Sequence, residues 1–333
     1  MTSQSNEPTV QSVRDMAYAF QKSRVLLSAY ELGLFTALGD EELAADEVAM
    51  RVGAHAGAVG RLLNALVALG LVRKSEGRFS NSPFASEHLV EGKPGYMAGL
   101  MHGANQWHTW SSLTEVVRTG KSLVPHHVSH RGVEWLRAFI AAMHWRGVPQ
   151  APETLAPVDL RGVERILDVG GGSGAYSMEM VRREPGAQAV VFDLPEVVGL
   201  TQEYVAAAGL SERVTTQPGD YTRDELGRDY DLVFLSAIVH SNSYQANRSL
   251  VAKCARALAP GGRLVIVDYV MSEDRTQPPE GAMFSINMLL GTEGGDNYTE
   301  REMREWLRDA GLEFVSRTDL PFGTSVVIGR KAK

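Results

Sequence analysis

A single cysteine, Cys254, and the absence of long apolar runs limit what this 333-residue chain can be. One cysteine excludes an intramolecular disulfide and any zinc site built from several thiolates. No apolar stretch approaches the ~18 residues that a membrane-spanning helix requires. The opening segment "MTSQSNEPTVQS" is polar and does not predict a signal peptide. The composition therefore predicts a cytoplasmic protein with no membrane segment.

Basic residues are also scarce: 33 lysines and arginines stand against 40 acidic residues, a formal net charge of −7. Proteins that bind nucleic acid neutralise phosphates with a basic surface, so this balance argues against that class. The chain is 44% hydrophobic and 22% charged, which is ordinary for a globular protein. Its length is sufficient for two domains.

Residues 1–95 are predicted to form the first domain. Apolar residues recur there at helical spacing, and two short strand-like runs follow the last helix. Three helices and a hairpin make a winged helix, a fold that often binds DNA. The helix that would read DNA, residues 57–69, offers only Arg61 and Asn64 as polar side chains, whereas base readout needs several. We therefore predict a winged-helix dimerisation domain, with a winged-helix transcription regulator as an alternative.

Residues 96–157 are predicted to form a helical linker that lines a substrate pocket. The segment is rich in tryptophan and methionine, most of which we expect in the core. His126, His127 and His130 lie close together, a pattern that suggests a metal site. Proline and glycine mark this stretch as a loop and no carboxylate accompanies it, so we favour a surface loop and predict no metal.

Residues 158–333 are predicted to form an α/β domain. The strand-like runs "ERILDVG", "AQAVVFDL", "RVTTQPGD", "YDLVFLS" and "GRLVIVDYV" are separated in several places by helical segments. This alternation indicates a parallel sheet with helices on both faces, as in Rossmann-like folds. The last runs, "LEFVSRTDL" and "TSVVIGRK", are joined by a connection too short for a parallel crossover. The sheet is therefore expected to end in an antiparallel hairpin.

The segment "ILDVGGGSGAYS" is the strongest local signal for a ligand. Gly170, Gly172 and Ala175 match the dinucleotide fingerprint G-x-G-x-x-G/A, so a nicotinamide cofactor must be considered. Asp168 ends the preceding strand, where a carboxylate would suit a ligand that carries an ammonium group. The fingerprint alone does not decide between cofactors.

Acidic residues at the ends of the next strands favour S-adenosylmethionine over a nicotinamide. Asp193 ends the second strand, where it can accept both ribose hydroxyls, and Asp220 and Tyr221 follow the third. Ligands of open α/β sheets bind beyond the carboxyl ends of the strands, and these residues all lie there. The amino-acid tail, ribose and adenine of S-adenosylmethionine would each find a partner.

These segments together resemble a known family. "ELGLF", "LLNALVALGLV", "ILDVGGGSG", "VFDLPEVV", "PGDY" and "ALAPGGRLVIVD" are similar to the small-molecule O-methyltransferases typified by plant caffeate and isoflavone enzymes, whose bacterial relatives act on natural products. The resemblance covers nearly the whole chain. It implies a class I methyltransferase sheet and a homodimer formed through the N-terminal domain.

The resemblance also implies roles for individual residues. Gly170 would lie against the methionine part of the cofactor, Asp193 would hold the ribose, and Asp220 and Tyr221 would frame the adenine. We also assign Leu194, beside Asp193, to the cofactor site. Ser236 stands where plant members have a lysine that contacts the adenine. The expected cofactor-binding residues are Asp168, Gly170, Gly172, Asp193, Leu194, Asp220, Tyr221 and Ser236.

His240 in "VHSNS" aligns with the general base of the family, and its place just past a strand end independently fits that role. A phenol has a pKa of ~10 and imidazole ~6.5, so proton removal is expected to accompany methyl transfer. Asp268, at the end of the neighbouring strand, is expected to orient the imidazole. Its alternative role is a strand-end cap.

Two departures from the family pattern leave the acceptor atom open. His-Ser-Asn replaces His-Asp-Trp, and Asn297 stands where plant members have a second glutamate, with Asp296 beside it as a substitute. An enol, a carboxylate, a nitrogen or a carbon nucleophile therefore remains possible beside a phenol. The residues expected to line the acceptor pocket are Trp107, Met143, His144, Asn242, Asn287 and Met288.

The sequence thus predicts an S-adenosylmethionine-dependent methyltransferase that modifies a hydroxyl on an aromatic or polyketide-like small molecule, with His240, Asp268 and Asn297 in its catalytic site. The alternatives are a C- or N-methyltransferase, a member of the same family that binds the cofactor without transferring its methyl group, and the transcription regulator.

Overall fold

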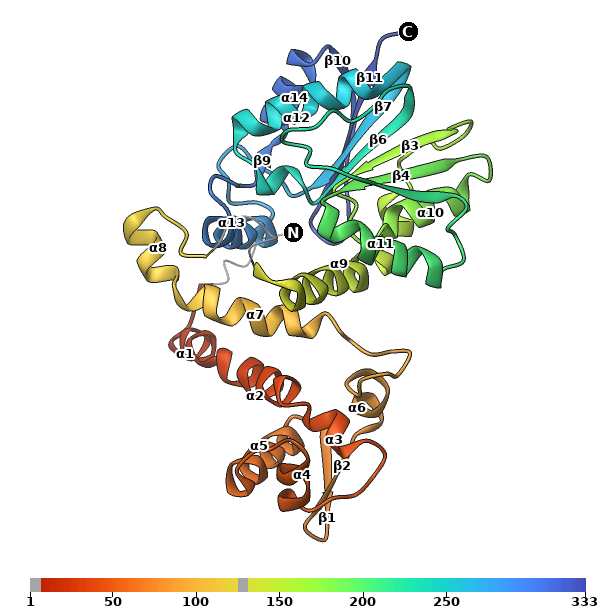
Figure 1. The fold of residues 1–333 in the computed structure, drawn as a ribbon. Helices are drawn as coiled ribbons and strands as arrows, with labels where there is room; N and C mark the ends of the chain where they lie inside the picture. Colours follow the sequence, from red (N-terminus) through yellow and green to blue (C-terminus); the bar gives the residue numbers. More distant parts are fainter. Residues whose placement is uncertain (1–6, 125–130) are drawn as a thin grey trace, which may run out of the picture. The chain divides into compact units, whose positions relative to one another are not determined.

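The computed structural model describes residues 7–124 and 131–333, and the chain divides between Asn105 and Gln106 into two compact units (Figure 1). Helix α7 (Leu100–Ser111) contains this boundary. Within the described ranges, the search for a helix with the length and apolarity needed to cross a bilayer finds none.

The N-terminal unit is mainly helical and carries a two-stranded hairpin. The hairpin turns at Glu76 and Gly77, whose φ angles are 48° and 81°, as a tight two-residue turn requires. Its leucine-rich core includes Leu34, Leu63 and Leu66, which are fully buried. The elements are α1 (Val10–Tyr18), α2 (Phe20–Glu31), α3 (Leu34–Leu38), α4 (Ala45–Arg51), α5 (Ala56–Ala68), β1 (Val72–Ser75), β2 (Arg78–Asn81) and α6 (Pro83–His88).

Helix α1 stands apart from that core. None of its residues is buried, and Val10 and Met16 are 74% and 75% exposed. A helix of nine residues is not stable on its own in water and needs a surface to pack against. Its apolar side chains are therefore available for contact with another surface.

The C-terminal unit is built on a seven-stranded sheet of order β10-β11-β7-β6-β3-β4-β5. Strands β5, β4, β3, β6 and β7 are parallel, and β11 and β10 are antiparallel to their neighbours. The predicted parallel sheet with a C-terminal antiparallel hairpin is confirmed. The strands are β3 (Arg165–Val169), β4 (Gln188–Asp193), β5 (Val214–Pro218), β6 (Tyr230–Ser236), β7 (Leu258–Asp268), β10 (Leu312–Asp319) and β11 (Ser325–Lys331).

Helices cover both faces of this sheet. Side chains alternate along a strand, so Val233 and Leu235 of β6 pack toward α12 and α14, while Leu232 and Phe234 pack toward α10 and α11 (Figure 1). The helices of this unit are α8 (Leu113–Thr119), α9 (Val133–Thr154), α10 (Ala175–Arg183), α11 (Pro195–Ala207), α12 (Tyr244–Ala257), α13 (Pro279–Gly291) and α14 (Glu300–Asp309).

One feature of this unit was not predicted from the sequence. The two-residue strands β8 (Val270–Met271) and β9 (Tyr298–Thr299) pair in parallel just beyond β7. This pairing brings the loop before β9, with Asp296 and Asn297, to the edge of the sheet where β7 ends. Strands this short carry no periodicity that a sequence could reveal.

Candidate functional site

The loop after β3 strongly favours glycine at its first position. Gly170 has φ +69°, and a Cβ atom added there would lie 2.2 Å from the Cδ1 atom of Ile238. The backbone N–H of Gly170 donates to the carbonyl of Phe192 at 2.7 Å, which joins this loop to the end of β4. Gly172 also has positive φ, at +57°. The bare backbone of the loop can therefore approach a ligand closely.

Asp168 lies beneath this loop rather than on its surface. The side chain is 1% exposed, and its Oδ2 atom accepts a hydrogen bond from the Ser177 hydroxyl at 2.7 Å. Burial raises the pKa of Asp168 to about 7, and the bond from Ser177 opposes that shift. Direct contact between Asp168 and a ligand stays a prediction.

Asp193 connects the end of β4 with the glycine loop. Its Oδ2 atom accepts from the backbone N–H of Gly172 and its Oδ1 atom from that of Leu194, each at 2.8 Å. Burial raises the pKa of Asp193 to about 6, and these two N–H groups act in the opposite direction. The residue as a whole is partly exposed to solvent at the end of β4.

Tyr221, in the loop after β5, lies at the same edge of the sheet. Its hydroxyl donates to the Oδ1 atom of Asn242 at 3.2 Å, and burial raises its pKa to about 12. The neighbouring Asp220 uses Oδ1 to accept from the backbone and hydroxyl of Thr222. Ser236 is the last residue of β6 and is partly exposed. The edge where β3 to β6 end thus gathers the residues that the sequence assigned to a cofactor.

His240 lies on a short 3₁₀ helix, η2 (Val239–Ser241), that follows β6. Its Nδ1 atom is 2.8 Å from the Oδ1 atom of Asp268, which ends β7. His240 is 8% exposed and Asp268 3%, so water cannot easily compete for this contact. An ionised carboxylate can only accept, so the Nδ1 atom donates to it, and in the neutral imidazole the lone pair is then on the Nε2 atom.

Phe284 on α13 forms one wall beside the imidazole. The rings of Phe284 and His240 lie edge to face with centroids 4.8 Å apart, and Tyr269 packs on Phe284 from another side. The sequence analysis did not single out Phe284. The signal was present in "AMFSINMLL", but apolar spacing alone does not reveal which face of a helix meets a catalytic loop.

Asn297 is turned toward α13. Its Nδ2 atom donates to the carbonyl of Gly281, while its Oδ1 atom is buried without a hydrogen-bond partner in the described ranges. Asp296 forms an ion pair with Arg275 at 3.2 Å. Within residues 7–124 and 131–333, the side-chain partners found for Asp296 and Asn297 do not include His240, and the catalytic role of Asn297 stays a prediction.

The residues expected to line the acceptor pocket lie in varied surroundings. Asn287 accepts from the indole of Trp110 at 3.3 Å, a contact that was not predicted from the sequence. His144 is bonded through Nδ1 to the Ser173 hydroxyl of the glycine loop at 2.9 Å and stacks on Tyr204. Burial lowers the pKa of His144, which favours the neutral ring.

The other residues expected to line the acceptor pocket differ in their exposure to solvent. Met288 is buried, whereas Trp107 and Met143 are partly exposed on α7 and α9. Their contact with an acceptor stays a prediction. Cys254 is fully buried and burial raises the pKa of its thiol to about 12, so it is not a nucleophile.

His126, His127 and His130 lie outside the described residues. Among residues 7–124 and 131–333, no group of three or more histidine, cysteine, aspartate and glutamate side chains is arranged to hold a metal ion.

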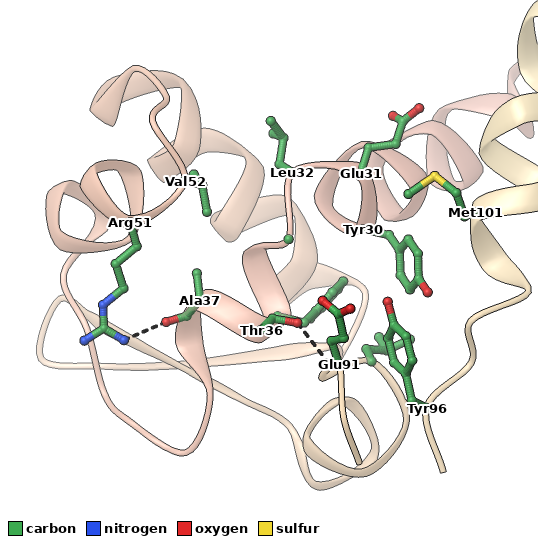
Figure 2. Close-up of a pocket in the computed structure, with 13 residues that line it drawn as sticks. Tyr30, Glu31, Leu32, Thr36, Ala37, Arg51, Val52, Glu91, Tyr96 and Met101 are labelled. Atoms are coloured by element: carbon green, nitrogen blue, oxygen red, sulfur yellow. Dashed lines mark hydrogen bonds between the residues drawn. The ribbon is translucent and has the colours of Figure 1, made fainter. Parts of the chain in front are cut away.

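The N-terminal unit has a hollow of its own. It measures about 490 Å³ and is bordered by the stacked rings of Tyr30 and Tyr96, whose centroids are 5.8 Å apart (Figure 2). Arg51 closes another side and donates to the carbonyl of Ala37 at 2.8 Å.

Two family models match separate parts of this chain. A family model described as the O-methyltransferase domain matches residues 110–313, and one described as the O-methyltransferase dimerisation domain matches residues 15–91. The 3-hydroxy-5-methyl-1-naphthoate 3-O-methyltransferase of Streptomyces sahachiroi is 37% identical, over 96% of this chain and 94% of that protein.

Two further relatives extend this agreement. The tetracenomycin polyketide synthesis 8-O-methyl transferase of Streptomyces glaucescens is 33% identical over 96% of both chains. The structure of human N-acetylserotonin methyltransferase in complex with S-adenosylmethionine is 27% identical, with a TM-score of 0.84 over the full length of both chains. The chain therefore belongs to the S-adenosylmethionine-dependent O-methyltransferase family.

Proposed function

We propose that this enzyme transfers the methyl group of S-adenosylmethionine to a hydroxyl of an aromatic or polyketide-like small molecule, with His240 as the general base. The observation that carries the proposal is the contact between the His240 Nδ1 atom and Asp268 at 2.8 Å, which leaves the Nε2 atom able to accept a proton. The two streptomycete relatives, whose names specify a naphthoate and a tetracenomycin polyketide, support this class of acceptor.

The residues at the sheet edge fit the cofactor. The bare backbone at Gly170 and Gly172 allows close approach, and Asp168 and Asp193 give the site negative charge when they are ionised, which their burial makes costly. Placing two carboxylates in poorly solvated positions is costly unless a cation balances them, and S-adenosylmethionine carries an ammonium and a sulfonium. Gly170, Gly172, Asp193, Leu194 and Tyr221 would hold it.

When bound, S-adenosylmethionine supplies an electrophilic methyl group on a sulfur that leaves as a neutral thioether. His240 takes the proton of the acceptor hydroxyl at Nε2 while the oxygen forms its bond to the methyl carbon. Asp268 holds the Nδ1 proton and stabilises the imidazolium that results. Phe284 packs edge to face with the imidazole and supports the position of the ring.

We also propose that the enzyme is a homodimer through its N-terminal unit. The match to a dimerisation domain over residues 15–91 supports this assembly. The exposed apolar side chains Val10, Val13 and Met16 of α1 support it as well, because they would be covered in a dimer.

Product analysis tests the proposed reaction. The enzyme would be incubated with methyl-labelled S-adenosylmethionine and a panel of hydroxylated naphthoates and polycyclic aromatic compounds, and the products identified by mass spectrometry and NMR. We expect the label in an O-methyl group, with far less product from His240→Ala. A label on nitrogen or carbon would contradict the proposal and favour the C- or N-methyltransferase. Cofactor binding with no transfer to any acceptor would favour a non-methylating member.

A further inference from the structure

The side chain of Asn242 forms hydrogen bonds that hold the turn carrying His240. The Nδ2 atom of Asn242 donates to the carbonyl of Ile238 at 3.4 Å and to the Oδ1 atom of Asn247 at 3.2 Å. Asn247 is fully buried and donates to the carbonyl of Val239 at 2.7 Å. The two asparagines therefore fasten both residues that precede His240.

Asn242 also contacts the part of the site where we propose that the cofactor binds. Its Oδ1 atom accepts from the hydroxyl of Tyr221 at 3.2 Å, and its backbone carbonyl accepts from the hydroxyl of Tyr298. Tyr221 is itself fixed, because Lys253 donates to its backbone carbonyl at 2.8 Å. A contact thus runs from the loop after β5 to the turn that holds the base.

Asn242 has little capacity left for a substrate. An asparagine amide has two N–H donors, and both have partners here, Ile238 and Asn247. The sequence analysis expected Asn242 to contact the acceptor. These hydrogen bonds favour a different role, since a substrate would have to displace contacts that already exist.

We propose that Asn242 is a positioning residue that joins Tyr221, on the cofactor side, to the turn that holds His240 against Asp268. The inference rests on the proposed role of His240 as the base. Its consequence is that cofactor binding near Tyr221 and alignment of the imidazole are linked through one side chain. Misplacement of a catalytic group by ~1 Å can cost about 10²-fold in rate.

Steady-state kinetics on Asn242→Ala separates the two roles. We expect kcat to fall about 10- to 100-fold with the acceptor KM nearly unchanged, because alignment is lost and not binding. Asn242→Asp keeps the shape and an oxygen for Tyr221 but loses both donors, and should show the same defect. Tyr221→Phe removes only the hydroxyl and should lower kcat less. Asn64→Ala, on the exposed face of α5, and Tyr230→Phe, at the opposite end of β6, are the matched controls.

Proton NMR supplies a second measurement. In wild type, the downfield Nδ1 proton shared by His240 and Asp268 should be visible, and in Asn242→Asp and Tyr221→Phe it should weaken or exchange faster. A raised acceptor KM with unchanged kcat would overturn the inference and make Asn242 an acceptor ligand. An unaltered proton signal with wild-type kcat in both variants would overturn it too. Failure of the proposed function is recognised separately, because His240→Ala would then keep full turnover.

Discussion

Asp268 contacts His240 twice, through the imidazole Nδ1 atom at 2.8 Å and through the backbone N–H at 3.2 Å. One carboxylate therefore fixes both the ring and the turn that carries it. The Oδ1 atom also accepts from the N–H of Tyr269 at 2.9 Å, so Asp268 cannot rotate without losing three hydrogen bonds. The imidazole of His240 is therefore held in one tautomer and one orientation before any substrate binds.

Replacement of Asp268 tests this support. Asp268→Asn keeps the shape of the side chain but can donate as well as accept, so it no longer selects the Nδ1-protonated tautomer. We expect a lower rate, with a smaller loss than in His240→Ala because the imidazole is kept. Single-turnover measurements with saturating cofactor would show the effect on chemistry alone. A rate equal to wild type would make Asp268 only a cap for the end of β7.

Asp193 should be the main polar anchor of the cofactor. Asp193→Ala is expected to weaken binding of S-adenosylmethionine by roughly 1.5–3 kcal/mol, the value for charge-assisted hydrogen bonds. Titration calorimetry measures it directly, and NADH serves as the comparison ligand. Asp231→Ala, which removes a carboxylate at the other end of the sheet, should leave affinity unchanged. Binding of NADH by wild type would overturn the cofactor assignment.

Cofactor affinity should rise with pH. Burial raises the pKa of Asp168 to about 7 and of Asp193 to about 6, and a cationic ligand favours the ionised carboxylates. Binding between about pH 5 and 7 should therefore release protons. Calorimetry in two buffers of different ionisation enthalpy counts them, and Asp193→Asn should reduce the release. Affinity that is independent of pH over this window would contradict the expectation.

The same two carboxyls contribute to the stability of the ligand-free protein with a definite sign. In the unfolded chain an aspartate has a pKa of ~3.9. Between about pH 4 and 7 Asp168 and Asp193 therefore hold more protons in the folded state than in the unfolded state, and their contribution to the free energy of unfolding falls as pH rises. Saturating cofactor should weaken this fall.

The N-terminal unit should hold two chains together. Light scattering at micromolar concentration is expected to give twice the mass of one chain, and charged substitutions at Val13 and Met16 on α1 should weaken the assembly. Charged substitution of Val315, an exposed valine of β10, is the matched control. A stable, active monomer of the wild-type chain would contradict the homodimer.

The fold was largely predictable because the strands and helices of the C-terminal unit carry strong local patterns. The apolar runs around Leu167, Phe192 and Phe234 became β3, β4 and β6, and the connection after Asp319 was too short for anything but a hairpin. The strands of a parallel sheet are buried on both faces, so they appear in the sequence as continuous apolar runs. These runs can be recognised without knowing which distant residues they contact.

The detail of the site was less predictable because it depends on which side chains meet across the sheet edge. Asp268 and His240 were expected as a pair, since parallel strands end at one edge. The bonds of Asn242 to Tyr221, and of Asn287 to Trp110, join segments far apart in the chain and follow from no local pattern. Phe284 was missed for the same reason.

The most direct test of the whole account is the rate of His240→Ala on an acceptor that the wild type methylates. If His240 is the base, the rate should fall by ~10²–10⁴, the usual range for a positioned general base, while calorimetry shows nearly unchanged affinity for S-adenosylmethionine. The loss should shrink as pH approaches the pKa of the acceptor, because an ionised nucleophile needs no base. Wild-type turnover by His240→Ala would contradict the account. It would show that methyl transfer here needs only the positioning of the two reactants and no general base.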